Sequence, residues 1–174
     1  MDRWRNMVII LMGVAGSGKT SVGELLARRL GWRFRDADDF HPAANREKMR
    51  RGLPLDDHDR RPWLEAIRGA IVQSLQAGEN AIFACSALRQ AYRTFLAGDA
   101  GEVGFVYLKG APELIATRLA NRRDHFFDPA LLQTQFNDLE EPRGVFEANI
   151  ALPPAEIADS IIATLGLRPE PVSG

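Results

Sequence analysis

The chain contains Gly13-Val14-Ala15-Gly16-Ser17-Gly18-Lys19-Thr20, a segment that fits the phosphate-binding pattern Gly-x4-Gly-Lys-Ser/Thr. An apolar run, Met7–Met12, leads directly into it, and apolar residues recur at helical spacing over Val22–Leu30 behind it. The order strand, glycine-rich loop and helix predicts a loop that holds a polyphosphate with inward-pointing backbone N–H groups. In such a loop Lys19 bridges the terminal phosphates of a nucleotide, and Thr20 offers its hydroxyl to Mg²⁺.

The composition is that of one globular domain without a strong charge bias. The 174 residues, 45% of them hydrophobic and 26% charged, suffice for one core and are ordinary for soluble proteins. The net charge of −1 gives no reason to expect nucleic acid or an anionic membrane as a partner. The apolar run Met7–Met12 is too short to span a membrane. A single cysteine, Cys85, excludes an internal disulfide, so we expect a cytoplasmic protein.

Strand and helix patterns alternate along the chain, which is typical of an α/β fold. We expect a parallel sheet with helices on both faces, in one domain over residues 1–167 with a disordered tail at 168–174. The predicted strands are Met7–Met12, Trp32–Arg35, Asn80–Cys85, Val103–Leu108 and Val145–Ile150. Helices are predicted to begin near Val22, Ala43, Pro62, Ser86, Pro112, Asp128 and Pro154.

Polar residues follow the first three strands, at the sheet edge where ligands bind in parallel sheets. Asp36 and Asp38 follow the second strand and Ser86 follows the third. Two-residue spacing in an extended chain puts both carboxylates on one side. We interpret Asp36, with Thr20, as a magnesium site and Asp38 as the acid that accepts a hydroxyl proton. The alternative is an ordinary loop with solvated aspartates.

Arginine pairs suggest further phosphate and carboxylate contacts. Arg118 and Arg122 lie one helical turn apart, and residues of about 118–130 have the character of a lid that closes over a nucleotide. The alternative is a solvated helix end. Arg89 and Arg93 either clamp an acceptor carboxylate or lie on the surface. The three histidines have no metal-ligand spacing, and the aspartates at 56–59 are more typical of a helix cap than of a cation site.

Several longer motifs resemble those of one kinase family, the thermoresistant-type gluconate kinases, which are relatives of the shikimate and adenylate kinases. The resemblance runs from about Val8 to about Leu165. Its most selective segments are His41-Pro42-x-x-Asn45-x-x-Lys48-Met49, Cys85-Ser86-Ala87-Leu88 and Leu139-Glu140-Glu141-Pro142.

The resemblance implies a P-loop kinase fold with strand order 2-3-1-4-5 and a mobile lid. It further implies ATP- and Mg²⁺-dependent phosphorylation of D-gluconate at its 6-hydroxyl, by a homodimer. The implied catalytic residues are Lys19, Asp38 and Arg122. ATP would contact Gly13, Ala15, Gly16, Ser17, Gly18, Lys19, Thr20, Arg118, Arg122 and Asn149. Gluconate would contact Asp38, His41, Lys48, Asp59, Arg60, Ser86, Arg89, Arg93 and His125.

Two other functions fit part of the pattern. A shikimate-like kinase of the same fold is the nearer one, but the glycine-rich acceptor loop it needs after the third strand is missing. An ATP-binding regulatory module without transfer chemistry is the other. The presence of Lys19, Thr20, Asp38 and Arg122 together disfavours that module, because loss of at least one such group is expected when no transfer occurs.

Overall fold

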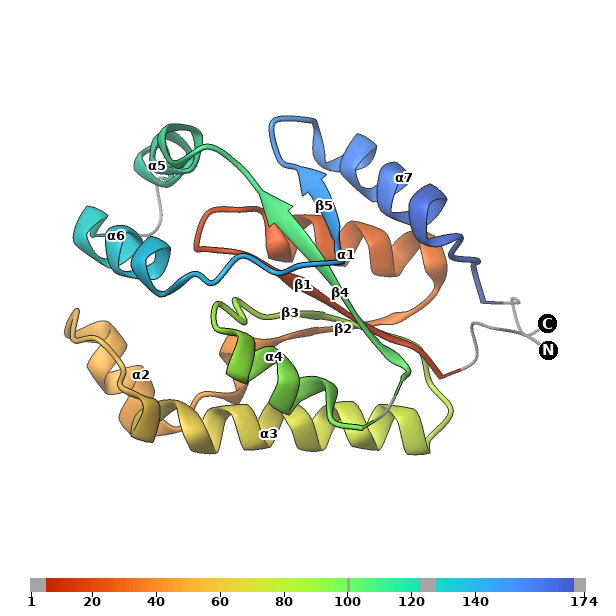
Figure 1. The fold of residues 1–174 in the computed structure, drawn as a ribbon, viewed down its shortest axis with the longest axis horizontal. Helices are drawn as coiled ribbons and strands as arrows, with labels where there is room; N and C mark the ends of the chain where they lie inside the picture. The colour runs from red at the N-terminus through yellow and green to blue at the C-terminus, as the bar shows by residue number, and fades with distance from the viewer. Residues whose placement is uncertain (1–5, 100, 123–127, 171–174) are drawn as a thin grey trace.

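The protein is built on a five-stranded parallel sheet with the order β2-β3-β1-β4-β5, as predicted (Figure 1). The computed structural model describes residues 6–99, 101–122 and 128–170. The strands are β1 (Val8–Met12), β2 (Arg33–Asp36), β3 (Ala81–Ala84), β4 (Val103–Lys109) and β5 (Phe146–Asn149). All five residues of β1 are buried, because this central strand is covered on both faces.

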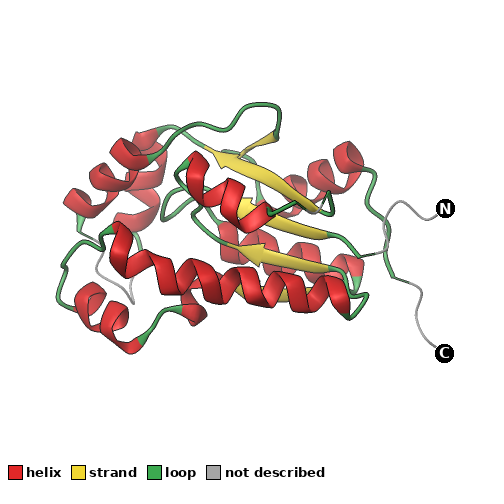
Figure 2. Ribbon diagram, turned by 60° about the horizontal axis from the view of Figure 1, so that its bottom comes forward, coloured by secondary structure: helices red, strands yellow, loops and turns green. Residues whose placement is uncertain are grey.

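Helices cover both faces of the sheet (Figure 2). One face packs against α1 and α7, with contributions from α5 and α6, and the other packs against α3 and α4. The bounds are α1 (Lys19–Leu30), α2 (Ala43–Arg50), α3 (Asp57–Gln76), α4 (Gln90–Ala97), α5 (Pro112–Ala120), α6 (Pro129–Asp138) and α7 (Pro154–Leu165). A short 3-10 helix, η1 (Ala37–Phe40), follows β2. No helix in the described part of the chain is long and apolar enough to cross a bilayer.

Helix α3 begins at Asp57, five residues before the predicted start at Pro62. Asp56 accepts a hydrogen bond from the backbone N–H of Asp59 (2.7 Å), and the Asp59 carboxylate accepts one from the N–H of Asp56 (3.0 Å). This reciprocal capping box stabilises the first turn ahead of the proline. The aspartates at 56–59 therefore form a helix cap, as the sequence favoured.

Helix α4 begins at Gln90, whereas the sequence predicted a start at Ser86. Ala87 has a φ of +45°, which no right-handed helix accommodates. The side chain of Arg93 donates to the carbonyl oxygens of Ala87 (2.7 Å) and Leu88 (3.0 Å), so this loop is held from inside the protein.

The last described residues are not a free tail. The backbone N–H of Glu170 donates to the carbonyl of Leu30 (2.8 Å), and the Asn80 side chain donates to the Glu170 carboxylate (3.0 Å). Residues 168–170 are thus attached to the body, contrary to the prediction of a disordered tail. Residues 171–174 lie outside the described residues.

Candidate active site

A cavity of about 470 Å³ opens at the carboxyl ends of the strands. Its lining comes from the phosphate loop, the segment after β2, the segment between α2 and α3, the segment after β3, and α6. It includes these predicted site residues: Ala15, Gly16, Gly18, Lys19, Thr20, Asp36, Asp38, His41, Arg60, Ser86 and Arg122. The structure therefore confirms the prediction that residues following separate strands meet in one cavity.

The glycines of the phosphate loop meet specific steric needs. Gly16 has a φ of +78°, and a Cβ built there would lie 2.7 Å from the Cγ of Leu119 on α5. Gly18 is the N-cap of α1 with a φ of +93°. Both positions need the left-handed region, which glycine enters without a steric cost. The loop backbone can then turn into the N-terminus of α1, where anions are favoured.

The Lys19 ammonium lies inside this loop. It donates to the carbonyl oxygens of Gly13 and Val14, each at 3.0 Å. Burial lowers the pKa of Lys19, while the carboxylates of Asp38 and Asp36 oppose that shift. A cation held within the loop, close to two carboxylates, is suited to meet the terminal phosphates of a nucleotide.

Thr20 and Asp36 bring two side-chain oxygens together at the edge of the loop. The Thr20 hydroxyl donates to Oδ2 of Asp36 at 2.9 Å, although the two residues come from α1 and the end of β2. Mg²⁺ in nucleotide sites is held by one or two such protein oxygens together with phosphates and water. No group of three or more histidine, cysteine, aspartate or glutamate side chains able to hold a metal occurs among the described residues. The pair thus fits a nucleotide-bound Mg²⁺ rather than a closed metal site.

Asp38 reaches the cavity from η1, not from the extended chain that we assumed. Asp36 accepts from the Asp38 N–H (2.9 Å), and the indole N–H of Trp63 donates to the Ala37 carbonyl (2.7 Å), so the turn is fixed from both sides. Although Asp38 as a residue is exposed to the cavity, partial burial of its carboxyl raises its pKa, and Asp36 adds to the rise. Lys19 opposes the shift. A raised pKa suits a carboxylate that accepts a proton.

His41, which also lines the cavity, is a neutral polar group. Its ring stacks on Trp63 with centroids 4.5 Å apart and planes 7° apart. Burial, with the nearby Arg46 and Arg60, lowers the pKa of His41 to about 4. The amide nitrogen of Asn45 lies 3.3 Å from its Nδ1, which makes Nδ1 the acceptor and leaves the proton on Nε2. His41 can therefore donate a hydrogen bond to a ligand hydroxyl.

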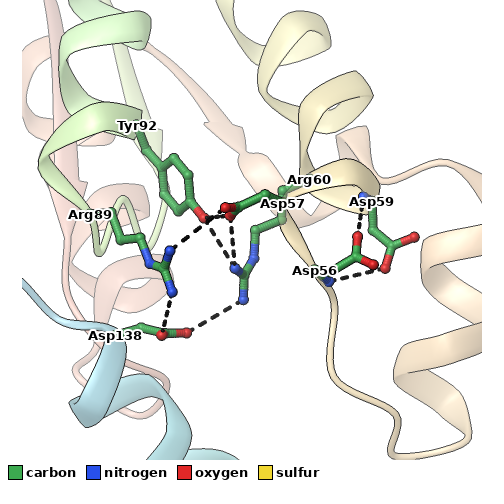
Figure 3. A network of polar contacts seen from close by, with 7 residues as sticks. All are labelled: Asp56, Asp57, Asp59, Arg60, Arg89, Tyr92 and Asp138. Atoms are coloured by element: carbon green, nitrogen blue, oxygen red, sulfur yellow. Dashed lines mark hydrogen bonds and ion pairs between the residues drawn. The ribbon is translucent and has the colours of Figure 1, made fainter.

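A cluster of charged residues borders the cavity, which Arg60, Tyr92 and Asp138 of the cluster line; Figure 3 shows the contacts within it. Arg89 pairs with Asp138 at 2.8 Å, and Arg60 pairs with the other oxygen of Asp138 at 3.5 Å. The hydroxyl of Tyr92 donates to Asp57 (2.6 Å) and accepts from Arg60 (3.1 Å). Two guanidinium groups are thus held beside the cavity by two carboxylates and a phenol.

Several predicted contacts are made within the protein instead. Lys48 pairs with Asp59 at 2.6 Å, and neither lines the cavity. Arg93 is only 3% exposed, and its guanidinium donates to backbone carbonyls, including that of Glu140 (2.7 Å). Arg93 is therefore an internal support, and the alternative that it lies on the surface is wrong. Arg89 does not line the cavity itself, but it pairs with Asp138, which does.

The two arginines of the predicted lid point to different places. Arg122 lines the cavity, whereas Arg118 donates to the carbonyl of Ile150 at 2.5 Å, next to Asn149. The Asn149 side chain caps its own turn by accepting from the N–H of Ala151 (3.0 Å). His125 and residues 123–127 of the predicted lid lie outside the described residues.

Sequence reasoning missed several cavity residues, above all Tyr92, Gln135 and Asp138. Gln135 accepts a hydrogen bond from the backbone N–H of Ala15 in the phosphate loop, at 2.7 Å. The i, i+3 spacing of Gln135 and Asp138 places both on one helix face, but nothing in the sequence shows which residues that face meets.

Comparisons with known proteins agree with this geometry. The shikimate kinase family model matches residues 15–169. A probable gluconokinase of Xenopus tropicalis is 43% identical over 151 residues, covering 78% of this chain and 80% of that protein. A gluconokinase of Arabidopsis thaliana is 41% identical over 170 residues, covering 89% and 90%.

Solved structures give the same picture. The crystal structure of a gluconokinase from Sinorhizobium meliloti has a TM-score of 0.83 at 41% identity and covers 92% of each chain. A shikimate kinase from Aquifex aeolicus, with a TM-score of 0.60 at 20% identity, shares the fold.

Proposed function

Since this chain belongs to the gluconokinase family, within the wider group that the shikimate kinase model matches, we propose that it phosphorylates D-gluconate with ATP. The products are 6-phospho-D-gluconate and ADP. The observation that carries the proposal is the shared cavity: Lys19 of the phosphate loop and Asp38 of η1 line the same space. A donor phosphate and an acceptor hydroxyl can therefore meet within it.

In the proposed reaction, Asp38 accepts the proton of the acceptor 6-hydroxyl as its oxygen attacks the γ-phosphorus. The bond from phosphorus to the β–γ bridging oxygen breaks, and ADP leaves with that electron pair. Lys19 and Arg122 neutralise the negative charge on the moving phosphoryl group. Partial burial, which raises the pKa of Asp38, makes it a stronger base than an ordinary aspartate.

Thr20 and Asp36 would hold Mg²⁺, which would neutralise negative charge on the nucleotide phosphates. His41 and Ser86 line the cavity, and hydroxyl groups of an aldonate can pair with both. Arg60 and Arg89 are the cations placed to meet its carboxylate. We also propose that the protein is a homodimer and that it works in the cytoplasm. The thiol of Cys85 is buried, and because burial raises its pKa to about 12 it takes no part in the proposed reaction.

The test is ADP release by purified protein with and without D-gluconate, measured in a coupled assay. We expect strong gluconate-dependent turnover that disappears with EDTA. Shikimate is the matched second acceptor, because the shikimate kinase model also matches the chain. Turnover with shikimate and none with gluconate would replace the proposed acceptor. ATP binding without turnover on either acceptor would favour a nucleotide-binding module.

A further inference from the structure

Helix α6 contacts the phosphate loop through Gln135. Its side-chain oxygen accepts the Ala15 N–H at 2.7 Å, and both residues line the cavity. Ala15 lies in the part of the loop that precedes Lys19, so its N–H is one of the donors available to a bound phosphate. A side chain of α6 therefore accepts a hydrogen bond from a donor of the proposed nucleotide site.

One turn later, the same helix contacts the acceptor side through Asp138. Its carboxylate pairs with Arg89 (2.8 Å) and Arg60 (3.5 Å), as Figure 3 shows, and its side chain is only 20% exposed. These arginines are the cations that the proposed function assigns to the carboxylate of the acceptor. The Asp138 carboxylate therefore pairs with the same arginines that the proposed function assigns to the carboxylate of gluconate.

Helix α6 is otherwise anchored by apolar packing: Leu132 is buried, and the half-buried Phe136 packs against the core. The polar contacts of Gln135 and Asp138 add to this packing in fixing its position. Since both contacts compete with a ligand, each ligand that binds releases one of the two attachments.

We propose that Gln135 and Asp138 are positioning residues that couple nucleotide binding to acceptor binding through α6. This inference rests on the proposed function for its acceptor half. Because Gln135 and Asp138 lie on one helix, the substrate that binds first and displaces its contact shifts α6 and loosens the other contact, so the second substrate displaces a weaker one. By linkage the effect is reciprocal: gluconate tightens ATP binding by the same factor by which ATP tightens gluconate binding.

Isothermal titration calorimetry with a non-hydrolysable ATP analogue in Mg²⁺ buffer tests the nucleotide half. In Gln135→Ala the analogue no longer displaces an internal acceptor, so its affinity without gluconate should rise about threefold to tenfold, the size of one net hydrogen bond. The matched control is Gln133→Ala, on the same helix, where the glutamine pairs with Asn137 and does not line the cavity. It should leave the affinity unchanged.

Titration of gluconate tests the acceptor half. Asp138→Asn should tighten gluconate binding in the absence of nucleotide severalfold, since the arginines lose their internal counterion. Asp159→Asn is its control, because Asp159 also pairs with an arginine, Arg29 in the last turn of α1, and neither residue lines the cavity. In the wild type, the analogue should tighten gluconate binding at least about fivefold, and each α6 variant should reduce that factor.

A merely structural role for Gln135 predicts the opposite sign, weaker nucleotide binding in Gln135→Ala, and that result would overturn the inference. Should this variant fail to fold, Gln135→Met keeps the side-chain length and carries the same expectation. Independent binding of the two ligands to the wild-type protein would also overturn the proposed coupling. That result would not contradict the proposed kinase activity. Absence of gluconate binding to the wild type would instead refute the proposed function.

Discussion

Replacing Asp38 with asparagine removes the proposed proton acceptor while keeping the local structure. The cap of η1 uses the backbone N–H of Asp38, which donates to Asp36 at 2.9 Å and is unchanged in the variant. A positioned general base contributes about 10²–10⁴-fold to a rate, so we expect kcat to fall at least about a hundredfold. That fall corresponds to about 2.7 kcal/mol of lost transition-state stabilisation.

The coupled ADP-release assay with saturating gluconate measures this loss. Asp39→Asn is the matched control, because Asp39 is the neighbouring exposed aspartate and does not line the cavity. It should stay within about twofold of the wild type, as surface substitutions do. If Asp38→Asn kept more than about a tenth of the wild-type kcat, its assignment as the proton acceptor would be wrong.

The same substitution should stabilise the protein at neutral pH. Because the folded-state pKa of Asp38 is raised above its ordinary 3.8, the folded chain binds that proton more tightly than the unfolded chain does. The ionised carboxylate therefore costs stability above the folded-state pKa, and the cost disappears as the pH falls to 3.8. Urea unfolding should show a higher midpoint for Asp38→Asn than for the wild type at pH 7, and a smaller difference near pH 4. Equal midpoints at pH 7 would contradict the raised pKa.

Three further changes follow from the same contacts. Lys19→Ala should lower kcat at least about a hundredfold in the ADP-release assay, because it removes the cation held within the phosphate loop; a smaller loss would mean that another group meets the terminal phosphate. Trp63→Phe leaves the buried Ala37 carbonyl without its donor and should lower the free energy of unfolding by about 1–3 kcal/mol in urea titrations. Gly16→Ala places a Cβ 2.7 Å from Leu119 at a φ of +78°, so calorimetry should show much weaker nucleotide binding; near-normal affinity would mean that the loop relaxes freely.

The sheet and the phosphate loop could be predicted because their signals are local. The apolar run of β1, the glycines behind it and the helical spacing of α1 lie within 30 residues of one another. The strand order came from the resemblance to gluconate kinases, and the structure confirms it. The start of α3 was misplaced because the proline at 62 outweighed the capping box formed by Asp56 and Asp59, a local signal that was available.

The acceptor side could not be predicted as well, because its charged residues pair with one another over long stretches of sequence. Lys48 and Asp59 were each predicted as separate acceptor contacts, and the structure pairs them with each other. Arg93 turns inward to a carbonyl 47 residues away, at Glu140. Gln135 meets the phosphate loop across 120 residues. The sequence shows which side chains are able to form ion pairs and hydrogen bonds. Which of them pair depends on the tertiary fold, which brings distant residues together.

Asn80 holds the two described ends of the chain side by side. Its side-chain oxygen accepts the Met7 N–H at 2.8 Å, and its amide nitrogen donates to Glu170 at 3.0 Å. In Figure 1 these ends lie opposite α2 and α6, which border the cavity. A short peptide could therefore join them, and new termini opened at an exposed loop would give a circular permutant with an unaltered cavity. The same geometry makes either end a suitable attachment point for a fluorescent reporter, at a distance from the ligands that it is meant to sense.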